Sequence, residues 1–249
     1  MDITDTPKTP LLGMDLAALG KVAAELGLPR FTAGQMFDWL YRKGIGEIDE
    51  MSNISLGGRA LIKGRYCVGM MGHVDCQRSV DGTVKYLFPT LSGHTVESVF
   101  IPDGERGTLC VSSQIGCRMG CRFCMTGRQG WHGNLDAAQI LNQIISIEES
   151  DKLTNIVFMG MGEPLDNYKV LSDVLDCLCS DWGFAWSPKR ITVSSIGVIP
   201  QLKRLLDEHK CHIAISLHDP FPEERLEIMP VQAAYGITEV VALDRKSVV

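Results

Sequence analysis

Apolar side chains recur at helical spacing through the first quarter of the chain. Over residues 15–26 they fall on one helix face, and a Gly-Leu-Pro stop signal follows. A second helix is predicted over residues 32–42, with Thr32 as its N-cap. We therefore expect a small N-terminal helical domain over residues 1–66.

The apolar pattern changes to short alternating runs after residue 66. Three β-rich runs lie within residues 73–102, and the turn signals Asp81-Gly82 and Ser92-Gly93 separate them. This spacing predicts a short antiparallel meander inside a connecting segment that spans residues 67–107.

Strand and helix patterns alternate through the remaining chain, residues 108–249. This order is typical of a parallel sheet with crossover helices, in which functional residues gather beyond the carboxyl ends of the strands. A polar or glycine-rich segment follows each predicted strand, so we expect one site at that edge. The predicted strands cover residues 108–113, 155–159, 190–194 and 212–217, and the predicted helices cover residues 135–149, 168–179 and 200–208.

The charge balance offers no general attraction for nucleic acid. The chain has 24 basic and 30 acidic residues, so an RNA or DNA partner would have to meet local basic patches. For each patch, a solvated charged face is the alternative. The candidates are Arg118, Arg122, Arg128 and His132 in the acid-free segment 117–133, and Arg59, Lys63 and Arg65.

No apolar run approaches the roughly 20 residues that a bilayer crossing needs, so we expect no membrane span. The first ten residues carry acids and prolines where a secretory signal has a basic segment and then an apolar one. This predicts a cytoplasmic protein, whose nine cysteines are reduced or bound to metal.

Cys117, Cys121 and Cys124 form a C-x3-C-x2-C run in a loop that follows a predicted strand. Thiolates are soft ligands for iron–sulfur clusters or zinc, and three of them leave one iron of a four-iron cluster open. A zinc site with His132 as fourth ligand is an alternative, although zinc sites favour C-x2-C pairs. Unligated core cysteines are a further alternative.

Four motifs in order resemble the RlmN/Cfr family of RNA adenosine methyltransferases, a branch of the radical S-adenosylmethionine (SAM) superfamily. The likeness covers the chain from residue 28 onward. The motifs are TLCVSSQIGCRMGCRFCMTGRQG (108–130), VFMGMGEPLDNY (157–168), RITVSSIGVIP (190–200) and IAISLHDPFPEERLEIMPV (213–231).

The resemblance implies an α/β fold, the radical SAM partial (β/α)6 barrel, with only about four βα units present in this chain. It makes residues 1–66 an RNA-binding accessory domain and residues 108–249 a C-terminally incomplete radical SAM core. The last of four predicted strands is therefore expected to have an unpaired edge.

The resemblance also implies a 4Fe-4S cluster and SAM as cofactors. Cys117, Cys121 and Cys124 would be the iron ligands, and the open iron would bind SAM and cleave it to a 5′-deoxyadenosyl radical. Gly162 and Glu163 would contact the amino group of SAM. The ribose and methionine portions would be lined by Ser194, Ser216, Leu217 and His218.

Two residues are implied to act on the RNA base. Glu97 lies in an apolar β-rich run, where burial would raise its pKa, and the family match makes it a proton acceptor. Cys110 matches the cysteine that resolves a covalent protein–RNA adduct through a transient disulfide. Strand alternation alone could point Glu97 to solvent, and a free cysteine is commonly a small buried residue.

The chain lacks the methyl-carrying cysteine that relatives have near their C-terminus, because its last cysteine is Cys211. The segment LDRKSVV at residues 243–249 resembles nothing in the family. We expect a truncated product that cannot complete methyl transfer alone. Ser195-Ile196 and Asp219 also depart from the expected family residues.

The expected reaction is methylation of carbon 2 of an adenosine in 23S rRNA, with tRNA as a second substrate. An electron donor such as flavodoxin and a monomeric state are also expected. Methylation at carbon 8, as in the Cfr branch, is one alternative, and a non-catalytic RNA-binding remnant is another.

Overall fold

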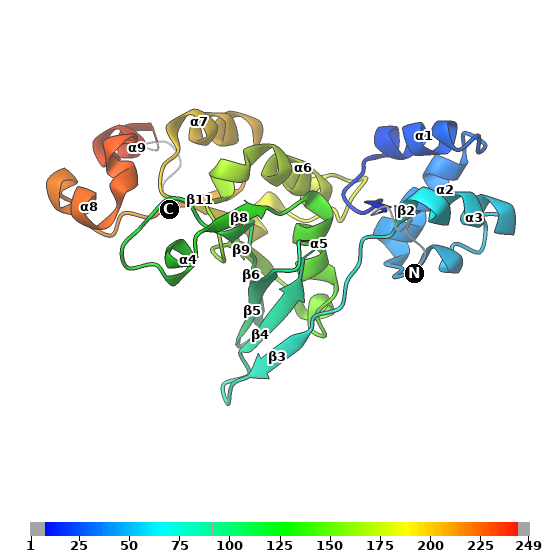
Figure 1. Cartoon of the computed structure of the whole chain (residues 1–249), viewed down its shortest axis with the longest axis horizontal. Helices are drawn as coiled ribbons and strands as arrows, with labels where there is room; N and C mark the ends of the chain where they lie inside the picture. The colour runs from blue at the N-terminus through cyan, green and yellow to red at the C-terminus, as the bar shows by residue number, and fades with distance from the viewer. Residues whose placement is uncertain (1–7, 91, 244–249) are drawn as a thin grey trace.

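The fold is built on a seven-stranded mixed sheet with helices packed against it (Figure 1). A computed structural model describes residues 8–90 and 92–243. The C-terminal segment 243–249 therefore lies outside the described residues except for its first residue. Most of the first ten residues, which carry the prolines, lie outside them as well. The strand order is β11-β10-β9-β6-β5-β4-β3, so a parallel half and an antiparallel half share one sheet.

The parallel half comprises four strands joined by crossover helices, as predicted. Each lies close to its predicted range, and β11 pairs only with β10 among the described residues, which confirms the expected edge. The strands are β6 (Arg106–Cys110), β9 (Asn155–Phe158), β10 (Ile191–Ser195) and β11 (His212–Ile215), and the helices are α5 (Ala137–Ile145), α6 (Tyr168–Cys179) and α7 (Ile199–Glu208).

The predicted meander extends this sheet through antiparallel pairing. It consists of β3 (Asp75–Arg78), β4 (Val84–Pro89) and β5 (Thr95–Asp103), and β5 pairs with β6. Glu149, beyond α5, accepts hydrogen bonds from Tyr86 Oη at 2.5 Å and Arg78 Nη1 at 2.9 Å. These bonds fasten the meander to the helical layer.

Alternation along the strands assigns the two faces of the sheet. Leu109, Ile156 and Ile191 are fully buried on one face. Cys110 pairs with Val157 on β9 and with Val99 on β5, so these residues share the opposite face. Glu97 and Ser194 lie on that second face by the same register.

The N-terminal helical module occupies one end of the molecule in Figure 1. Its helices are α1 (Leu16–Glu25), α2 (Thr32–Asp38) and α3 (Leu56–Arg65), and α2 continues as a π-helical turn over Trp39–Lys43. Asp15 caps α1 by accepting from Ala18 N at 2.7 Å. The prediction that Thr32 caps the second helix is wrong, because Phe31 is the N-cap and Thr32 is buried.

The remaining elements surround the predicted site. β7 (Gln114–Gly116) and β8 (Trp131–Asn134) form a two-stranded sheet around α4 (Met125–Arg128). α8 (Pro222–Ile228) and α9 (Ile237–Leu243) follow β11, and β1 (Thr9–Pro10) pairs with β2 (Tyr66–Cys67). No helix in the described ranges has both the length and the apolar character to cross a bilayer.

Aromatic rings join the N-terminal module to the segment after α6. Tyr41 lies 5.8 Å from Trp182 and 5.6 Å from Phe184 between ring centroids, with edge contacts in both pairs. Its buried hydroxyl accepts from Gly13 N at 2.9 Å and donates to Met14 O at 2.8 Å. Tyr41 therefore holds Gly13 and Met14, just before the first helix of the module, against the core.

Replacing Tyr41 by Phe should lower the free energy of unfolding by about 1–3 kcal/mol, because Gly13 N and Met14 O lose a buried partner. Urea unfolding followed by circular dichroism measures the change. Tyr235→Phe is the matched control, since the Tyr235 hydroxyl has no hydrogen-bond partner among the described residues. Equal losses in both variants would contradict this role of Tyr41.

Candidate cofactor site

The three clustered cysteines lie in the loop between β7 and α4. Gly116, at the end of β7, has a φ of +75°, and a Cβ there would lie 1.8 Å from the carbonyl oxygen of Gly130. Cys117 N donates to that same oxygen at 3.0 Å. The glycine therefore allows the two ends of the loop to close, which projects the cysteines from a fixed base.

The cysteine loop and the strand ends enclose one cavity of about 280 Å³. This volume is near the lower end of the range for small-molecule sites, about 300–1,000 Å³. The cavity is lined by Cys117, Cys121 and Cys124 together with Gly162, Glu163, Ser194, Ser216 and His218, all of which the resemblance singled out. The predicted edge therefore does bring these segments together.

The two glycines of the GMGEP segment permit close packing against the end of β6. A Cβ at Gly160 would lie 2.7 Å from Ser112 Oγ, and one at Gly162 would lie 2.5 Å from Gln114 Cβ. Gly162 also has a φ of +99°. Larger residues would push this segment away from the loop that carries the cysteines.

Glu163 is a buried carboxylate with backbone donors on two elements. Oε1 accepts from Leu165 N at 3.1 Å, and Oε2 accepts from Ile196 N at 3.0 Å. Burial raises the pKa of Glu163 to about 7, against the lowering effect of these hydrogen bonds. The side chain thus connects the segment after β9 to the segment after β10.

The predicted residues after β10 and β11 divide into two groups. Ser194 Oγ and Ser216 Oγ lie 3.5 Å apart and line the cavity. His218 has an unusual φ of +57°, and its ring lies 4.4 Å from that of Phe123 in the cysteine loop. Leu217 is exposed and does not line the cavity; its carbonyl oxygen accepts from Arg225 Nε instead.

The thiols of the cysteine loop are partly buried. Burial raises the pKa of Cys117 to about 11 and also raises the pKa of Cys121. Because metal ligation requires thiolates, metal binding at this site must release protons. In the described part of the chain, no three His, Cys, Asp or Glu side chains converge around a single-ion site.

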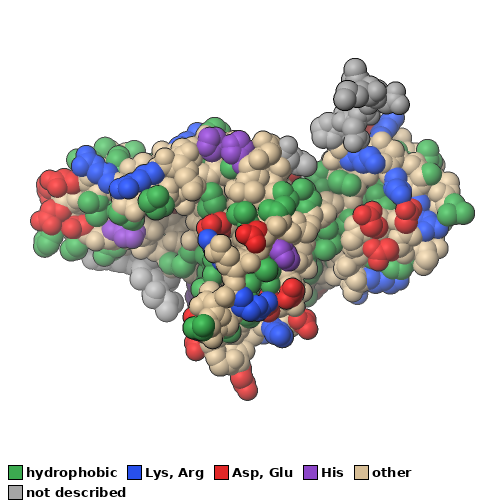
Figure 2. All heavy atoms as spheres, turned by 60° about the horizontal axis from the view of Figure 1, so that its bottom comes forward, with side chains coloured by type: hydrophobic (Ala, Val, Ile, Leu, Met, Phe, Trp, Pro, Cys, Tyr) green, Lys and Arg blue, Asp and Glu red, His purple; other side chains and the backbone are tan. Residues whose placement is uncertain are grey.

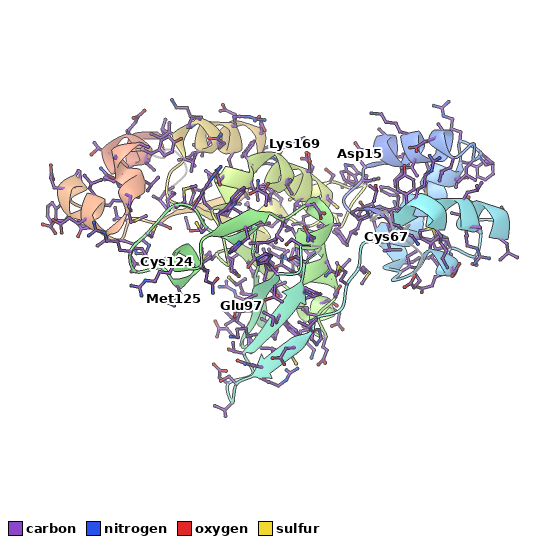
Figure 3. The ribbon with its side chains drawn as sticks, viewed as in Figure 1. Asp15, Cys67, Glu97, Cys124, Met125 and Lys169 are labelled. Carbon is purple, nitrogen blue, oxygen red and sulfur yellow. The ribbon has the colours of Figure 1, made fainter. Side chains whose placement is uncertain are left out.

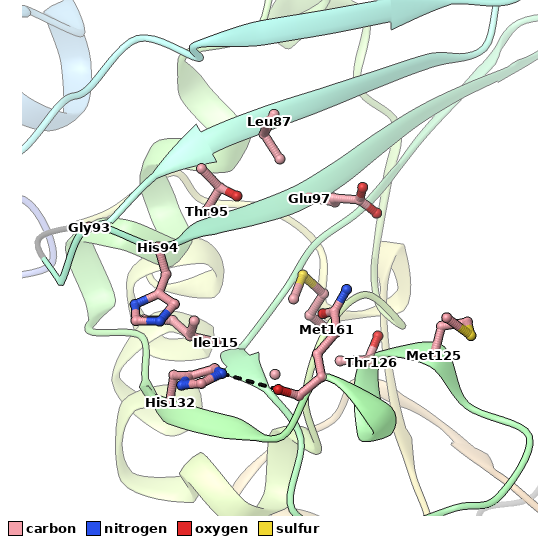
Figure 4. A pocket seen from close by; sticks show the side chains of 12 residues that line it. Leu87, Gly93, His94, Thr95, Glu97, Ile115, Met125, Thr126, His132 and Met161 are labelled. Carbon is pink, nitrogen blue, oxygen red and sulfur yellow. Dashed lines mark hydrogen bonds between the residues drawn. The ribbon is translucent and has the colours of Figure 1, made fainter.

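His132 lies at another cavity, of about 400 Å³, beside the predicted base-directed residue Glu97 (Figure 4). Its ring stacks on that of His94 with centroids 4.4 Å apart, and its Nε2 lies 3.1 Å from Gln129 O. His132 therefore does not line the cysteine cavity, which disfavours the zinc alternative. Figure 3 shows Glu97 on the sheet near the loop that carries Cys124 and Met125.

The expectation that Glu97 is buried is wrong. Its side chain is 46% exposed and pairs with Lys85 Nζ at 3.2 Å. The alternation of β5 buries Val96 and Ser98 and leaves Glu97 on the other face. Cys110 lies on that same face, and burial raises its pKa, although it lines neither cavity.

Both predicted basic patches are partly neutralised by local contacts. In the second patch, Lys63 pairs with Asp49 at 2.5 Å and Arg65 pairs with Glu25 at 2.6 Å. In the first, Arg118 forms a two-point pair with Asp166, at 2.8 and 2.5 Å. Figure 2 shows basic and acidic side chains interspersed on the face it presents.

Arg122 and Arg128 stay exposed in the first patch, and Arg128 Nη2 donates to Arg122 O at 3.0 Å. The cysteine loop therefore keeps two cations at its surface, while Arg118 is held by its acidic partner.

Sequence reasoning missed Gln114 and Asn167, two buried residues that hold the site from behind. Gln114 Oε1 accepts from Glu163 N at 2.9 Å, and its Nε2 donates to Asp166 and Asn134. Asn167 Nδ2 donates to Ser113 O and Leu135 O. Both lie inside recognised motifs, but each directly follows another polar residue, so no local pattern marked them as buried.

Family profiles match most of the chain. The profile described as Radical SAM superfamily matches residues 111–243, and the Ribosomal RNA large subunit methyltransferase N-terminal domain matches residues 9–68. The probable dual-specificity RNA methyltransferase RlmN of Bacteroides fragilis is 55% identical over 237 residues, 95% of this chain and 69% of that protein. The chain belongs to the RlmN family of the radical SAM superfamily.

More distant relatives agree with this membership. The dual-specificity RNA methyltransferase RlmN of Marinobacter nauticus is 40% identical, over 96% of this chain and 67% of that protein. A crystal structure of a radical SAM methyltransferase from Sphaerobacter thermophilus aligns with a TM-score of 0.89 at 35% identity, covering 96% of this chain and 72% of that one. The RlmN chain described here therefore has the radical SAM methyltransferase fold.

Glu163→Gln should destabilise the metal-free protein by about 1–3 kcal/mol, because an amide cannot accept from both Leu165 N and Ile196 N. The raised pKa of Glu163 adds a pH dependence: its ordinary value is 4.5 and its folded value about 7. The contribution to stability is complete below pH 4.5 and is lost as pH rises through 7.

The stability difference between wild type and Glu163→Gln should therefore shrink between pH 5 and pH 8. Urea unfolding at both pH values measures it. Glu105→Gln, at an exposed turn position between β5 and β6, is the matched control and should follow wild type. A difference that grows with pH would show that Glu163 is ionised in the folded protein.

Proposed function

We propose that this chain holds a 4Fe-4S cluster and SAM in the cysteine cavity, and that it is the radical SAM part of an enzyme that methylates carbon 2 of an adenosine in 23S rRNA and tRNA; methyl transfer itself would need the methyl-carrying cysteine that this chain lacks. The observation that carries the proposal is the single cavity shared by three thiols and the ends of three parallel strands. Its relatives are named as dual-specificity RNA methyltransferases, which supports RNA as substrate.

The donor set fits a cluster with an open iron. Cys117, Cys121 and Cys124 supply three soft ligands, and the rest of the cavity wall offers glycine backbone, hydroxyls and an imidazole. When bound, the cluster and SAM supply the electron and the 5′-deoxyadenosyl radical that start the reaction. The exposed apolar residues Phe123 and Met159 border the same cavity, where they can cover a bound cofactor.

The residues after the strands would fix the orientation of SAM. The hydroxyls of Ser194 and Ser216 line the cavity with His218 and would bond the ribose and methionine portions. Each Glu163 carboxylate oxygen keeps a lone pair beyond its backbone bond and can accept from the amino group. Gly162, which packs closely against Gln114, lines the cavity and would contact that group through its backbone.

The cavity at Glu97 is the proposed position of the target base. Ile115, Met125 and Met161 give it apolar walls that suit the faces of an adenine, and Glu97 supplies a carboxylate at one side. Glu97 and Cys110 share a face of the sheet, which supports roles for both on the same substrate. The exposed Arg122 and Arg128 would meet phosphates.

The proposal also covers the domain organisation and the working form of the protein. We infer that the four parallel strands form part of a partial (β/α)6 barrel, and that residues 1–66 act as an RNA-binding accessory domain. Residues 67–107 would connect it to the core. An electron donor such as flavodoxin and a monomeric state complete the proposed working form. Carbon-8 methylation and a non-catalytic RNA-binding role are the competing functions.

Anaerobic reconstitution of the purified chain should yield about four irons per chain and a charge-transfer absorbance band. Cys121→Ala should lose the cluster, because two thiolates cannot hold it. Cys76→Ala is the matched control, since Cys76 is exposed on β3 and lies outside the cavity. One zinc per chain, or equal iron in both variants, would refute the cluster assignment.

The reconstituted chain should also cleave SAM to 5′-deoxyadenosine in the presence of a chemical reductant. Ser216→Ala should reduce this cleavage roughly tenfold through loss of a hydroxyl contact. Liquid chromatography of the products measures the rate, with Ser92→Ala as an exposed control. Cleavage at background level with a loaded cluster would favour the non-catalytic alternative.

A further inference from the structure

Arg225 is completely buried, although it is one of the largest and most polar side chains of the molecule. Its exposed fraction is 0%, and it lies on α8, directly after the segment that carries Ser216 and His218. Arginine is rarely buried to this extent unless a partner compensates its charge. The groups that contact the guanidinium therefore determine whether its charge is compensated.

The guanidinium is held only by neutral oxygens among the described residues. Nε donates to Leu217 O at 3.1 Å, and Nη2 donates to Ser216 O at 3.2 Å and Ile196 O at 3.1 Å. Nη1 donates to Gln232 Oε1 at 2.6 Å. These bonds tie together the segments after β10 and β11 and the turn after α8.

Four neutral acceptors do not supply a counter-charge. Removing a cation from water is costly unless an anion compensates it, and no carboxylate of the described residues pairs with Arg225. Burial lowers the pKa of Arg225 for this reason. The guanidinium is thus buried next to the cofactor cavity, and no carboxylate among the described residues offsets the free-energy cost of its burial.

The cysteine loop is the neighbour that can supply negative charge. Arg122 N donates to Ile228 O, at the end of α8, at 2.9 Å, and Met229 lines the cavity beside the cysteines. Arg225 Nη2 donates to Ile196 O and Ser216 O, and both of these residues line the same cavity as the cysteines. The guanidinium therefore lies directly behind the wall of that cavity.

We propose that Arg225 is the buried counter-charge of the iron–sulfur cluster and a positioning residue that makes the cluster easier to reduce. This inference rests on the proposed function. Thiolate ligands give the cluster a negative charge, and one-electron reduction by an external donor makes it more negative. A fixed cation nearby stabilises the reduced form more than the oxidised form. No bond or proton at Arg225 changes in this step.

The test is the reduction potential of the reconstituted cluster, measured by an anaerobic redox titration followed by electron paramagnetic resonance. At the wild-type midpoint, Arg225→Gln should lower the ratio of reduced to oxidised cluster about tenfold, which is about 59 mV for one electron. Arg225→Lys keeps the charge and should stay within about twofold of wild type. Arg122→Gln is the matched control, because it removes an exposed, water-screened cation beside Cys121.

The outcomes separate this inference from the proposed function. A wild-type chain that takes up no cluster refutes the function, whereas equal iron and equal potentials in wild type and Arg225→Gln refute the counter-charge alone. A shift in Arg225→Lys as large as in Arg225→Gln would assign the effect to the hydrogen bonds and overturn the role of the charge. If Arg225→Gln does not fold, Arg225→Met, which removes the charge and keeps an apolar stem, replaces it with the same expected shift and the same contradicting outcome.

Discussion

The site depends on one close approach, between the chain after β6 and the chain after β9. Gly160 and Gly162 allow it, because a Cβ at either position would collide with Ser112 or Gln114. This contact places the cysteine loop, which continues from the first segment, beside Glu163, which ends the second. Without it the thiols and Glu163 would belong to two separate loops.

From this contact, hydrogen bonds extend across the edge of the sheet. Glu163 reaches the amide of Ile196 after β10, and Arg225 joins the carbonyl of Ile196 to that of Ser216 after β11. The two bonds to Ile196 are buried and the bond to Ser216 is partly buried, and in such surroundings a polar interaction is costly to break. These hydrogen bonds fix the loops that follow the parallel strands relative to one another.

Sequence patterns predicted the parallel strands and the edge where the site lies, because hydrophobic periodicity and strand-to-helix order are local signals. For Glu97 the apolar composition of its run predicted burial, whereas strand alternation allowed the half-exposed position beside Lys85 that the structure shows. Sequence patterns failed where a tertiary neighbour decides the outcome. Thr32 was expected as a cap, but packing buries it inside the first turn. No local pattern marks Arg225, because its backbone acceptors are carbonyl oxygens of loops outside its own helix, one of them at Ile196 after β10.

Ile196 shows how two buried polar side chains act on one peptide segment. Its N–H donates to Oε2 of Glu163 and its carbonyl oxygen accepts from the guanidinium of Arg225, so side chains from two other segments satisfy both of its backbone polar groups. Both bonds are buried, where a lost partner is costly because the group left behind is cut off from water. The loop after β10 is therefore fixed from two sides, by the segment after β9 and by α8.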